Sequence, residues 1–533
     1  MECENPTNPV PPRVPSPDLE REGAAKEDLT GRDRLASNIL ISWAAQSVFI
    51  IAGFFMPRMI DRRLGQGLLG VWDFAWSLVG YFALVQMGII SAVNRYVARY
   101  RAVGDTASVN RTVSSASCVL GLGALVVMGL TIGFALLLPR LFGGRLGENT
   151  LEAQWVVLFL GTSLAVQVAL APFNGVLVGC HCWALHNINS SGWYAATVVG
   201  MIVTLLVGGS LWILAAITLA GETLAAVRRT VLAYRVCQGL RVRWSLVRWQ
   251  TIGELFVFGG KTLIPSVSNL LVNQTTSILI VAHLGPAALA LYTRPFSLMH
   301  QVDTLVRKMA MTLTPTISSL ESTGNLGAIR ELAVKSARYS FYLSLPIVVL
   351  LVIFGGTIMR FWMGPRYANG LVPAILALGY LPVLVHSPVL NILSGLNAHG
   401  RLGIARFVAS LCSVGLNVLV LRYLRWGLVG TAVAVTLPLA LLNIIDIPLL
   451  ICRRVGLDIR EYSWSVILGP VIHVLPFAVC LTVARIVFRT NPLVGLACGG
   501  ATGSAVLLVL YWLYVLPKSV RETLAGKILG SAE

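Results

Sequence analysis

Long apolar stretches alternate with short polar connections along almost the whole chain. Apolar runs recur from Asn38 to near Pro517, and a helix of about 20 residues crosses a bilayer. Only helices and closed barrels satisfy their backbone polar groups in lipid, so the pattern predicts an all-α polytopic membrane protein with about fourteen spanning helices. The predicted spans are 38–57, 69–93, 112–138, 153–178, 188–208, 211–234, 253–283, 287–313, 336–359, 371–396, 402–423, 427–451, 463–486 and 492–516.

Composition and charge agree with this class. Of 533 residues, 56% are apolar and only 12% are charged, whereas a soluble protein has about 25% charged residues. The formal charge of +18 could suit nucleic acid, but the basic residues are spread between apolar runs and no basic-aromatic nucleic-acid motif occurs. The predicted inside connections hold about twice as many Lys and Arg as the outside ones, which predicts that both termini are cytoplasmic.

The polar segments divide the chain. Residues 1–37 are rich in Pro, Glu, Asp and Arg and lack an apolar signal region, which predicts a disordered cytoplasmic tail. Residues 237–252 form a basic linker with Trp244 and Trp249. We interpret it as an amphipathic strap in the headgroup zone, or as an ordinary positive-inside loop with interfacial tryptophans. The outside connections are too short for a catalytic domain, so the sequence predicts no enzyme.

A period of 220 residues relates two parts of the chain. Six helices per unit give the units the same orientation, so the repeat predicts an N-lobe at 38–236 and a C-lobe at 253–453 around a central cavity. Residues 454–533, with two further helices and a tail, lie outside it. The matches pair Leu64-Gly65 with Leu284-Gly285, Trp72 with Tyr292, Ser77-Leu78 with Ser297-Leu298 and Gly104 with Gly324, and a second block pairs Asn174–Gly179 with Asn391–Gly395.

These blocks resemble a known family. The stretches Leu64-Gly65, Leu69–Trp72, Arg95–Tyr100 and Gly104-Asp105, with their counterparts Leu284-Gly285, Tyr292–Leu298 and Pro315, are similar to the Wzx-type lipid-linked oligosaccharide flippases. That family belongs to the MOP (multidrug/oligosaccharidyl-lipid/polysaccharide) superfamily. The resemblance covers roughly residues 38–453. Family members often have alanine where this chain has Pro295.

The resemblance implies two six-helix lobes plus two helices, and alternating access without covalent chemistry. It implies a bacterial cytoplasmic membrane protein that exports undecaprenyl-pyrophosphate-linked oligosaccharide for O-antigen, capsule or exopolysaccharide, with a polysaccharide polymerase as a candidate partner. Two alternatives stay open. One is a cation-coupled multidrug or small-molecule exporter of the same superfamily, although the first span lacks the acid often associated with that branch. The other is a membrane glycosyltransferase or glycan polymerase.

Arg294 is the foremost candidate for holding the pyrophosphate. Its guanidinium offers bidentate donors to phosphate, and an arginine at membrane depth is usually kept for a polar cavity or a partner. Lys261 and Arg58 could add positive charge, unless they reach the membrane interface instead. The alternative for Arg294 is a buried ion pair with Asp303, Glu222 or Asp446.

Other polar residues are candidates for contacting sugars or a coupling ion. Asn269 and Asn273 share a helix face and could meet sugar hydroxyls together with Tyr292, or bond between helices. Glu222 and Asp446 are candidates for ion coupling, or for pairing with arginines of other helices, as is Asp73.

Neither a metal nor a nucleotide site is predicted. Cys180, Cys182 and His186 lack the spacing and the second cluster of a zinc site. The Gly-rich pieces lack the Lys-Ser/Thr of a phosphate-binding loop, so they indicate close helix packing. We therefore expect no cofactor.

Overall fold

The computed structural model of the chain describes residues 35–86, 88–310, 317, 320–321, 323, 325–396, 399–516 and 521–522. The side chains of residues 35–40, 42, 261–266, 308–310 and 399 lie outside this description. All regular elements among the described residues are helices, so the predicted all-α class is confirmed. The predicted tail, 1–37, falls almost wholly outside the described residues.

Helices follow one another through short connections. The first seven are α1 (Leu35–Leu64), α2 (Gln66–Phe82), α3 (Ile89–Ala102), α4 (Thr106–Leu146), α5 (Thr150–Gly179), α6 (Trp183–Val207) and α7 (Leu211–Val236). The next are α8 (Trp249–Leu284), α9 (Pro286–Ala310), α11 (Leu326–Met363), α12 (Leu371–Gly395), α13 (His399–Leu419), α14 (Gly427–Leu441) and α15 (Ile447–Val455). The last are α16 (Ile459–Val487) and α17 (Pro492–Leu510).

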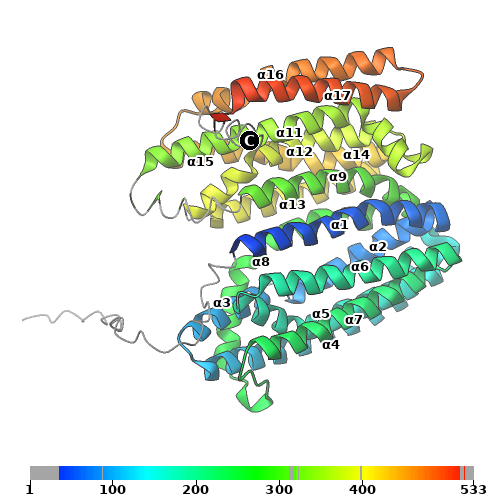
Figure 1. The fold of residues 1–533 in the computed structure, drawn as a ribbon. Coiled ribbons are helices and arrows are strands. Elements are labelled where there is room, and N and C mark those ends of the chain that lie inside the picture. The colour runs from blue at the N-terminus through cyan, green and yellow to red at the C-terminus, as the bar shows by residue number, and fades with distance from the viewer. Residues whose placement is uncertain are drawn as a thin grey trace, which may run out of the picture.

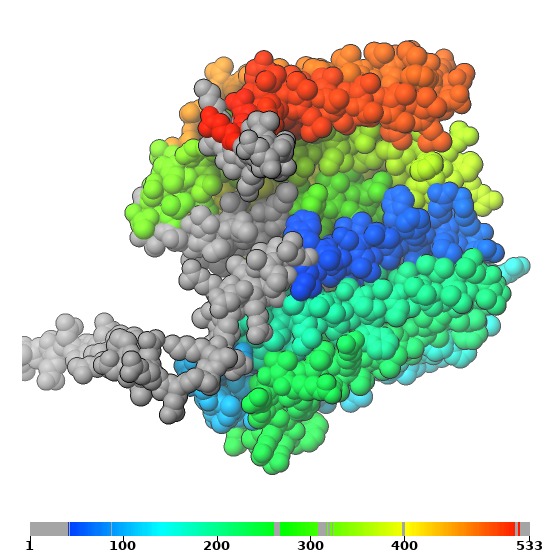
Figure 2. Space-filling view, viewed as in Figure 1, coloured from blue at the N-terminus to red at the C-terminus, as the bar shows by residue number. Residues whose placement is uncertain are grey.

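The helices lie in layers with their axes roughly side by side (Figure 1). We call α1–α7 the N-terminal half and α8–α15 the C-terminal half. Helices α16 and α17 pack on the side of α11 that faces away from the N-terminal half, and Figure 2 shows them as an outer layer. Both ends of the described chain lie at the same end of the molecule, which we call the tail end. The opposite end is the far end.

A helix occupies each predicted span, but the number of fourteen membrane-spanning helices is not confirmed. Among the described residues, twelve stretches are long and apolar enough to cross a membrane. One of them, 106–179, contains both α4 and α5, and α9 is not among them. The predicted second span also breaks, because the 3-10 turn Ala83–Gln86 ends α2 and Gly88, with φ of 85°, precedes α3. The chain is therefore a multi-pass membrane protein whose count of crossings is open.

Equivalent positions of the two halves adopt the same local structure. Gly65 before α2 has φ 93° and ψ 164°, and Gly285 before α9 has φ 86° and ψ 171°. An L side chain rarely adopts this positive φ, so the repeat keeps glycine at both positions. Likewise Asp105 caps α4 by accepting from the Ser108 N–H, and Asn325 caps α11 by accepting from the Ala328 N–H. These pairs are 220 residues apart, which supports the repeat, while the exact lobe boundaries stay a prediction.

The predicted linker lies along α4 as an extended strap. Only Trp244–Leu246 forms a short 3-10 turn, and α8 begins at Trp249. Side chains of α4 hold the backbone N–H groups of the strap. Asn110 accepts from Arg241, Ser114 from Arg243 and Ser115 from Arg248, at 2.9–3.2 Å. Trp244 and Trp249 are about four-fifths exposed, which fits both an amphipathic strap and an ordinary loop with interfacial tryptophans, so the interpretation stays a prediction.

Candidate functional site

The far end is closed between the two halves by close packing of α2 on α9. Gly70 lies directly against the backbone of Pro286, so that a Cβ at this position would overlap the proline carbonyl. One turn earlier, the Gln66 amide donates to the Ala287 carbonyl at 3.2 Å. This contact needs glycine at position 70, because any side chain there would force the helices apart.

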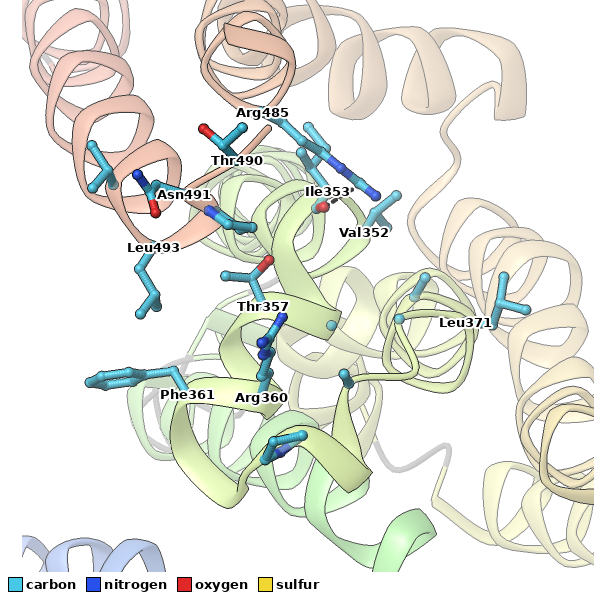
Figure 3. Close-up of a pocket in the computed structure, with 17 residues that line it drawn as sticks. Val352, Ile353, Thr357, Arg360, Phe361, Leu371, Arg485, Thr490, Asn491 and Leu493 are labelled. Carbon is cyan, nitrogen blue, oxygen red and sulfur yellow. Dashed lines mark hydrogen bonds between the residues drawn. The ribbon is translucent and has the colours of Figure 1, made fainter. Parts of the chain in front are cut away.

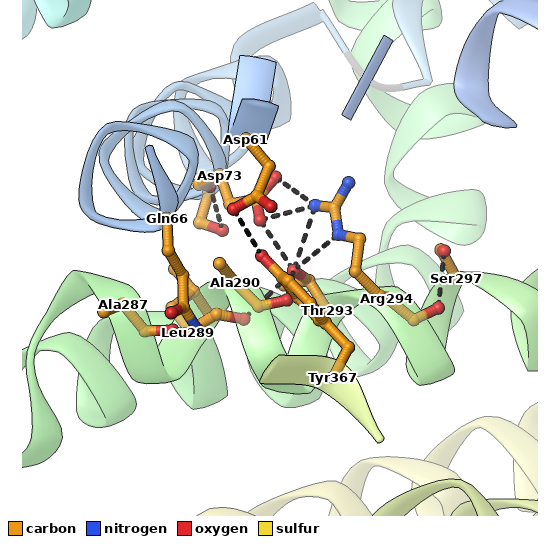
Figure 4. A network of polar contacts seen from close by, with 11 residues as sticks. Asp61, Gln66, Asp73, Ala287, Leu289, Ala290, Thr293, Arg294, Ser297 and Tyr367 are labelled. Carbon is orange, nitrogen blue, oxygen red and sulfur yellow. Dashed lines mark hydrogen bonds and ion pairs between the residues drawn. The ribbon is translucent and has the colours of Figure 1, made fainter. Parts of the chain in front are cut away.

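Arg294 lies in this contact and forms a buried ion pair with Asp73. Its Nη2 is 2.5 Å from both carboxylate oxygens, and the side chains are 7% and 12% exposed (Figure 4). Thr293 donates to Oδ2 of the same carboxylate at 2.6 Å. The ion-pair alternative therefore describes this structure, but the predicted partners Asp303, Glu222 and Asp446 are wrong. Asp73 neutralises the charge of the guanidinium within the protein, so Arg294 here joins the halves.

A second set of contacts joins α1 to the far end of α11. The Arg58 guanidinium donates to the Phe361 carbonyl at 2.9 Å, and Trp362 Nε1 donates to the Phe54 carbonyl at 2.7 Å. The Trp362 and Phe54 rings stack with centroids 4.5 Å apart. Beyond the helix end, Tyr367 donates to Asp61 at 2.9 Å. Arg58 thus binds a backbone carbonyl of the opposite half, and the far end is closed by two separate strips.

A cavity of about 250 Å³ lies beside the ion pair, within the N-terminal half. It is walled by α1, α2, α6 and α7, and Asp73, Glu222 and Arg294 are the charged groups in its lining. Arg229 of α7 lies close enough to Glu222 to interact with it electrostatically, so two carboxylates and two guanidinium groups lie in and around the cavity. A carboxylate can bind a cation or a proton, and the ion-coupling role of Glu222 stays a prediction.

A cationic cluster lies toward the tail end of the C-terminal half. Arg307 of α9 donates through Nε to Asp303 at 2.7 Å, and Arg406 of α13 is close enough to interact with both. The Arg406 Nη2 also lies 3.5 Å from Oδ1 of Asn269 on α8. Two guanidinium groups thus lie near one carboxylate, which is hydrogen-bonded to Arg307, and these three side chains carry one net positive charge. The Arg307 side chain is 37% exposed, so the cluster is open to a ligand.

The remaining predicted residues are placed differently. Tyr292 is 3% exposed, stacks on Phe296, and its hydroxyl has no hydrogen-bond partner among the described residues. Asn273 is half-buried on the same face of α8 as Asn269. Asp446 pairs with Arg401 at 2.9 Å, away from Glu222. The side chain of Lys261 lies outside the described residues, so its predicted role is untested.

Sequence reasoning missed Arg307 and Arg406 as site residues. Both were counted only as basic residues at the inner ends of helices. Arg406 stands seven residues inside α13, at a depth where a charged side chain usually has a function, and this signal could have singled it out. No group of three His, Cys, Asp or Glu able to hold a metal ion occurs among the described residues.

Comparison with known proteins relates the chain to exporters. Residues 182–371 match a family described as "Polysaccharide biosynthesis protein". A Shigella flexneri protein described as an O-antigen transporter is 21% identical over 407 residues, which cover 73% of this chain and 93% of that protein.

Solved transporter structures share the fold. The lipid II flippase MurJ in its inward closed conformation superposes with a TM-score of 0.70 at 14% identity, over 89% of this chain and 98% of that one. An inward-facing multidrug transporter of the MATE family of the MOP superfamily gives 0.63 at 14% identity, over 78% of this chain and 98% of that one. At this identity the likeness establishes the fold.

Proposed function

We propose that this chain, a member of the MOP superfamily, is a flippase that moves a lipid-linked oligosaccharide across the membrane for polysaccharide biosynthesis. The observation that carries the proposal is the cluster of Arg307, Arg406 and Asp303 toward the tail end, combined with a closed far end. A substrate that arrives from the tail end meets a net positive charge and finds no exit. The similarity to the O-antigen transporter, which spans both halves, supports the same substrate class.

Arg307 and Arg406 would bind the pyrophosphate that links glycan and lipid. Guanidinium groups form bidentate, charge-assisted hydrogen bonds to phosphate oxygens, and two of them can grip two phosphoryl groups. Asn269, beside Arg406, would contact sugar hydroxyls, and Asn273 on the same face would extend that contact. Arg294 would then act as a latch between the halves, and Arg58 as part of the second closing strip.

The transport cycle would be alternating access. Opening the far end requires that α2 separate from α9 and α1 from α11, which breaks the ion pair of Arg294 with Asp73 and the bond of Arg58 to the Phe361 carbonyl. A proton or cation that enters the cavity of Asp73 and Glu222 would neutralise the carboxylate side of the latch. Binding there would favour release of Arg294, since a ligand shifts an equilibrium by its preference for one state.

Charge and geometry support the membrane orientation that we propose. We place both termini in the cytoplasm of a bacterium, because the basic strap lies at the end of the molecule that holds both chain ends. The far end then faces the outside of the cytoplasmic membrane. A polymerase that consumes the exported lipid-linked units is the partner class we propose, and we assign no covalent chemistry to this chain.

The test is transport in vesicles that contain the purified full-length protein and a fluorescent lipid-linked oligosaccharide. We expect Arg307→Gln and Arg406→Gln each to lower the apparent affinity for substrate about tenfold or more, because each removes charge-assisted bonds. The matched control is Arg401→Gln, which removes an arginine of α13 that is 56% exposed and paired with Asp446. Transport unchanged in the first two variants would overturn the site.

A cation-coupled exporter of small molecules is the second candidate, favoured by the similarity to the MATE transporter and by the acidic cavity of Asp73 and Glu222. The same vesicles separate the two functions. Efflux of organic cations that depends on an ion gradient, without movement of the lipid-linked glycan, would support the exporter and contradict the flippase.

A further inference from the structure

A groove of about 1110 Å³ opens between the C-terminal half and the last two helices at the far end. Helices α11 and α12 form one wall, and the end of α16, the connection to α17 and the start of α17 form the other (Figure 3). Val352, Phe361, Leu371 and Leu493 make its surface largely apolar. Because α16 and α17 lie on the side away from the N-terminal half, the groove stands apart from the contact of α2 with α9.

Two arginines point into this apolar groove from opposite walls. Arg360 comes from the last turn of α11 and Arg485 from the last turn of α16, with Thr357 and Asn491 beside them (Figure 3). Arg485 donates one hydrogen bond to the Ile353 carbonyl, which aims its guanidinium across the groove. Within the described part of the chain, no carboxylate is bonded to either guanidinium. Both groups therefore have donors to offer to a ligand.

The chain segments that line the groove carry only positive charge. The sequence holds no Asp or Glu between Glu331 and Asp446, nor between Glu461 and Glu522. The far-end connections of these segments carry six arginines, at positions 360, 366, 422, 425, 485 and 489. Membrane proteins usually carry their excess of Lys and Arg in cytoplasmic connections. Six arginines at the proposed outer face therefore indicate an anionic partner. An apolar groove with guanidinium groups at its mouth suits a phosphate that carries a hydrocarbon chain.

The groove shares a wall with the closing strip between α1 and α11. The side chains of Arg360 and Phe361 line the groove, while the Phe361 carbonyl accepts from Arg58 and the adjacent Trp362 donates to α1. One turn of α11 therefore faces the groove on one side and α1 of the other half on the other. A ligand that fixes this turn acts directly on the closed far end.

We propose that the groove binds one anionic phospholipid of the far-end leaflet, with its phosphate between Arg360 and Arg485 and an acyl chain along the apolar wall, and that this lipid stabilises the closed far end. The volume is sufficient for a headgroup and part of a chain, since pockets for small ligands measure about 300–1,000 Å³. The lipid is a regulator here, because its site is separate from the cluster of Arg307 and Arg406.

The experiment uses the full-length protein, with its nine cysteines replaced, in phosphatidylcholine vesicles with rising fractions of phosphatidylglycerol. Spin labels at Arg63→Cys and Tyr423→Cys, both exposed at the far end of opposite halves, report the opening between them. We expect phosphatidylglycerol to raise the ratio of closed to open far ends about tenfold, the effect of one charge-assisted contact. Arg360→Gln and Arg485→Gln should abolish the response.

The control is Arg489→Gln, which removes a neighbouring arginine that does not line the groove and should keep the response. Melting temperatures in pure phosphatidylcholine establish that each variant is folded. A response to phosphatidylglycerol that persists in both groove variants, or that is lost equally in Arg489→Gln, overturns the site. If inorganic phosphate alone closes the far end to the same extent, the ligand of the groove is a free anion. If polyprenyl phosphate closes it more strongly than phosphatidylglycerol does, the ligand is the carrier lipid. Either result overturns the phospholipid.

Discussion

The Thr293 hydroxyl donates a 2.6 Å hydrogen bond to Asp73, a residue 220 positions earlier in the chain. This separation equals the period of the repeat, so equivalent positions of the two halves touch each other. Such a contact occurs where the axis that relates the halves passes between α2 and α9. The side chains that the two halves place at this axis nevertheless differ in chemistry. Arg294 has Phe74 as its equivalent, and Phe74 is buried against Phe142 with ring centroids 5.0 Å apart.

The ion pair of Arg294 with Asp73 should hold the far end closed. Asp73→Asn keeps the shape but leaves a buried guanidinium without its counterion, which costs about 3–5 kcal/mol for a buried pair. We expect Asp73→Asn and Arg294→Gln each to lower the free energy of unfolding and to widen the distance between spin labels at the far end. Thermal unfolding and label distances check this.

The double variant Asp73→Asn/Arg294→Gln separates the latch from general packing. Residues in contact deviate from additivity by about 0.5–3 kcal/mol, so the double variant should be more stable than the two single losses predict. Glu331→Gln is the control, because its pair with Lys335 is more than half exposed and contributes little. Strictly additive losses at positions 73 and 294 would contradict a direct latch.

The 220-residue repeat bears on which residues meet between the halves. Long apolar runs are sufficient to predict the helical class, because lipid admits only helices and closed barrels, but they do not predict the break between α2 and α3. The acids predicted as partners of Arg294 are Asp303, Glu222 and Asp446, and Asp73 is predicted only to pair with some arginine of another helix. Aligning the halves at 220 residues places Asp73 opposite Thr293, one residue from Arg294, and contact between equivalent positions then identifies the pair. A repeat predicts which positions are equivalent, but which of them meet at the axis depends on three-dimensional packing.

Gly70 should control how closely α2 approaches α9. Gly70→Ala places a methyl group on the Pro286 carbonyl, and overpacking of this kind costs about 1–3 kcal/mol. Because the closed far end depends on this approach, we expect the variant to favour the open far end and to slow return to the closed form. Single-molecule distance measurements across the far end check the prediction. Gly121→Ala, whose added methyl group meets open space in α4, should change neither the fraction of open far ends nor the rate of closing. If Gly70→Ala and Gly121→Ala have equal effects, the contact of Gly70 with Pro286 does not control closing.

The cationic cluster could not be predicted from one sequence, because its residues come together only in the folded protein. Arg307 and Arg406 are 99 positions apart on different helices, so no local motif joins them. Asp303 and Arg307 are four residues apart and were recognisable as a helical pair. Arg406 joins them only because α9, α8 and α13 pack together. The count of Lys and Arg assigns both arginines to the cytoplasmic ends of helices. That count does not indicate how deep each side chain lies within its helix.

Glu222 should couple an ion to opening if the cavity has that role. Glu222→Gln removes a carboxylate charge from the cavity, while an amide of the same size preserves packing. We expect transport driven by an ion gradient to fall about tenfold or more, with exchange in the absence of a gradient largely kept. Vesicle transport with and without a gradient measures both. Asp446→Asn, at the pair with Arg401, is the control. If coupling is lost in Asp446→Asn and kept in Glu222→Gln, the ion binds near Asp446 and the prediction for Glu222 is wrong.

Trp362 should determine the strength of the second closing strip. Its indole donates to the Phe54 carbonyl at 2.7 Å and stacks on the Phe54 ring, and the side chain is 2% exposed. Trp362→Phe keeps an aromatic ring but loses the hydrogen bond, which contributes about 0.5–1.5 kcal/mol. The ratio of closed to open far ends should therefore fall roughly twofold to thirteenfold. Trp362→Ala should lower it further, because it also removes the ring. Trp426→Phe, at a far-end residue that is 59% exposed, should leave the ratio unchanged. If label distances respond alike in Trp362→Phe and Trp426→Phe, the strip does not hold the halves together.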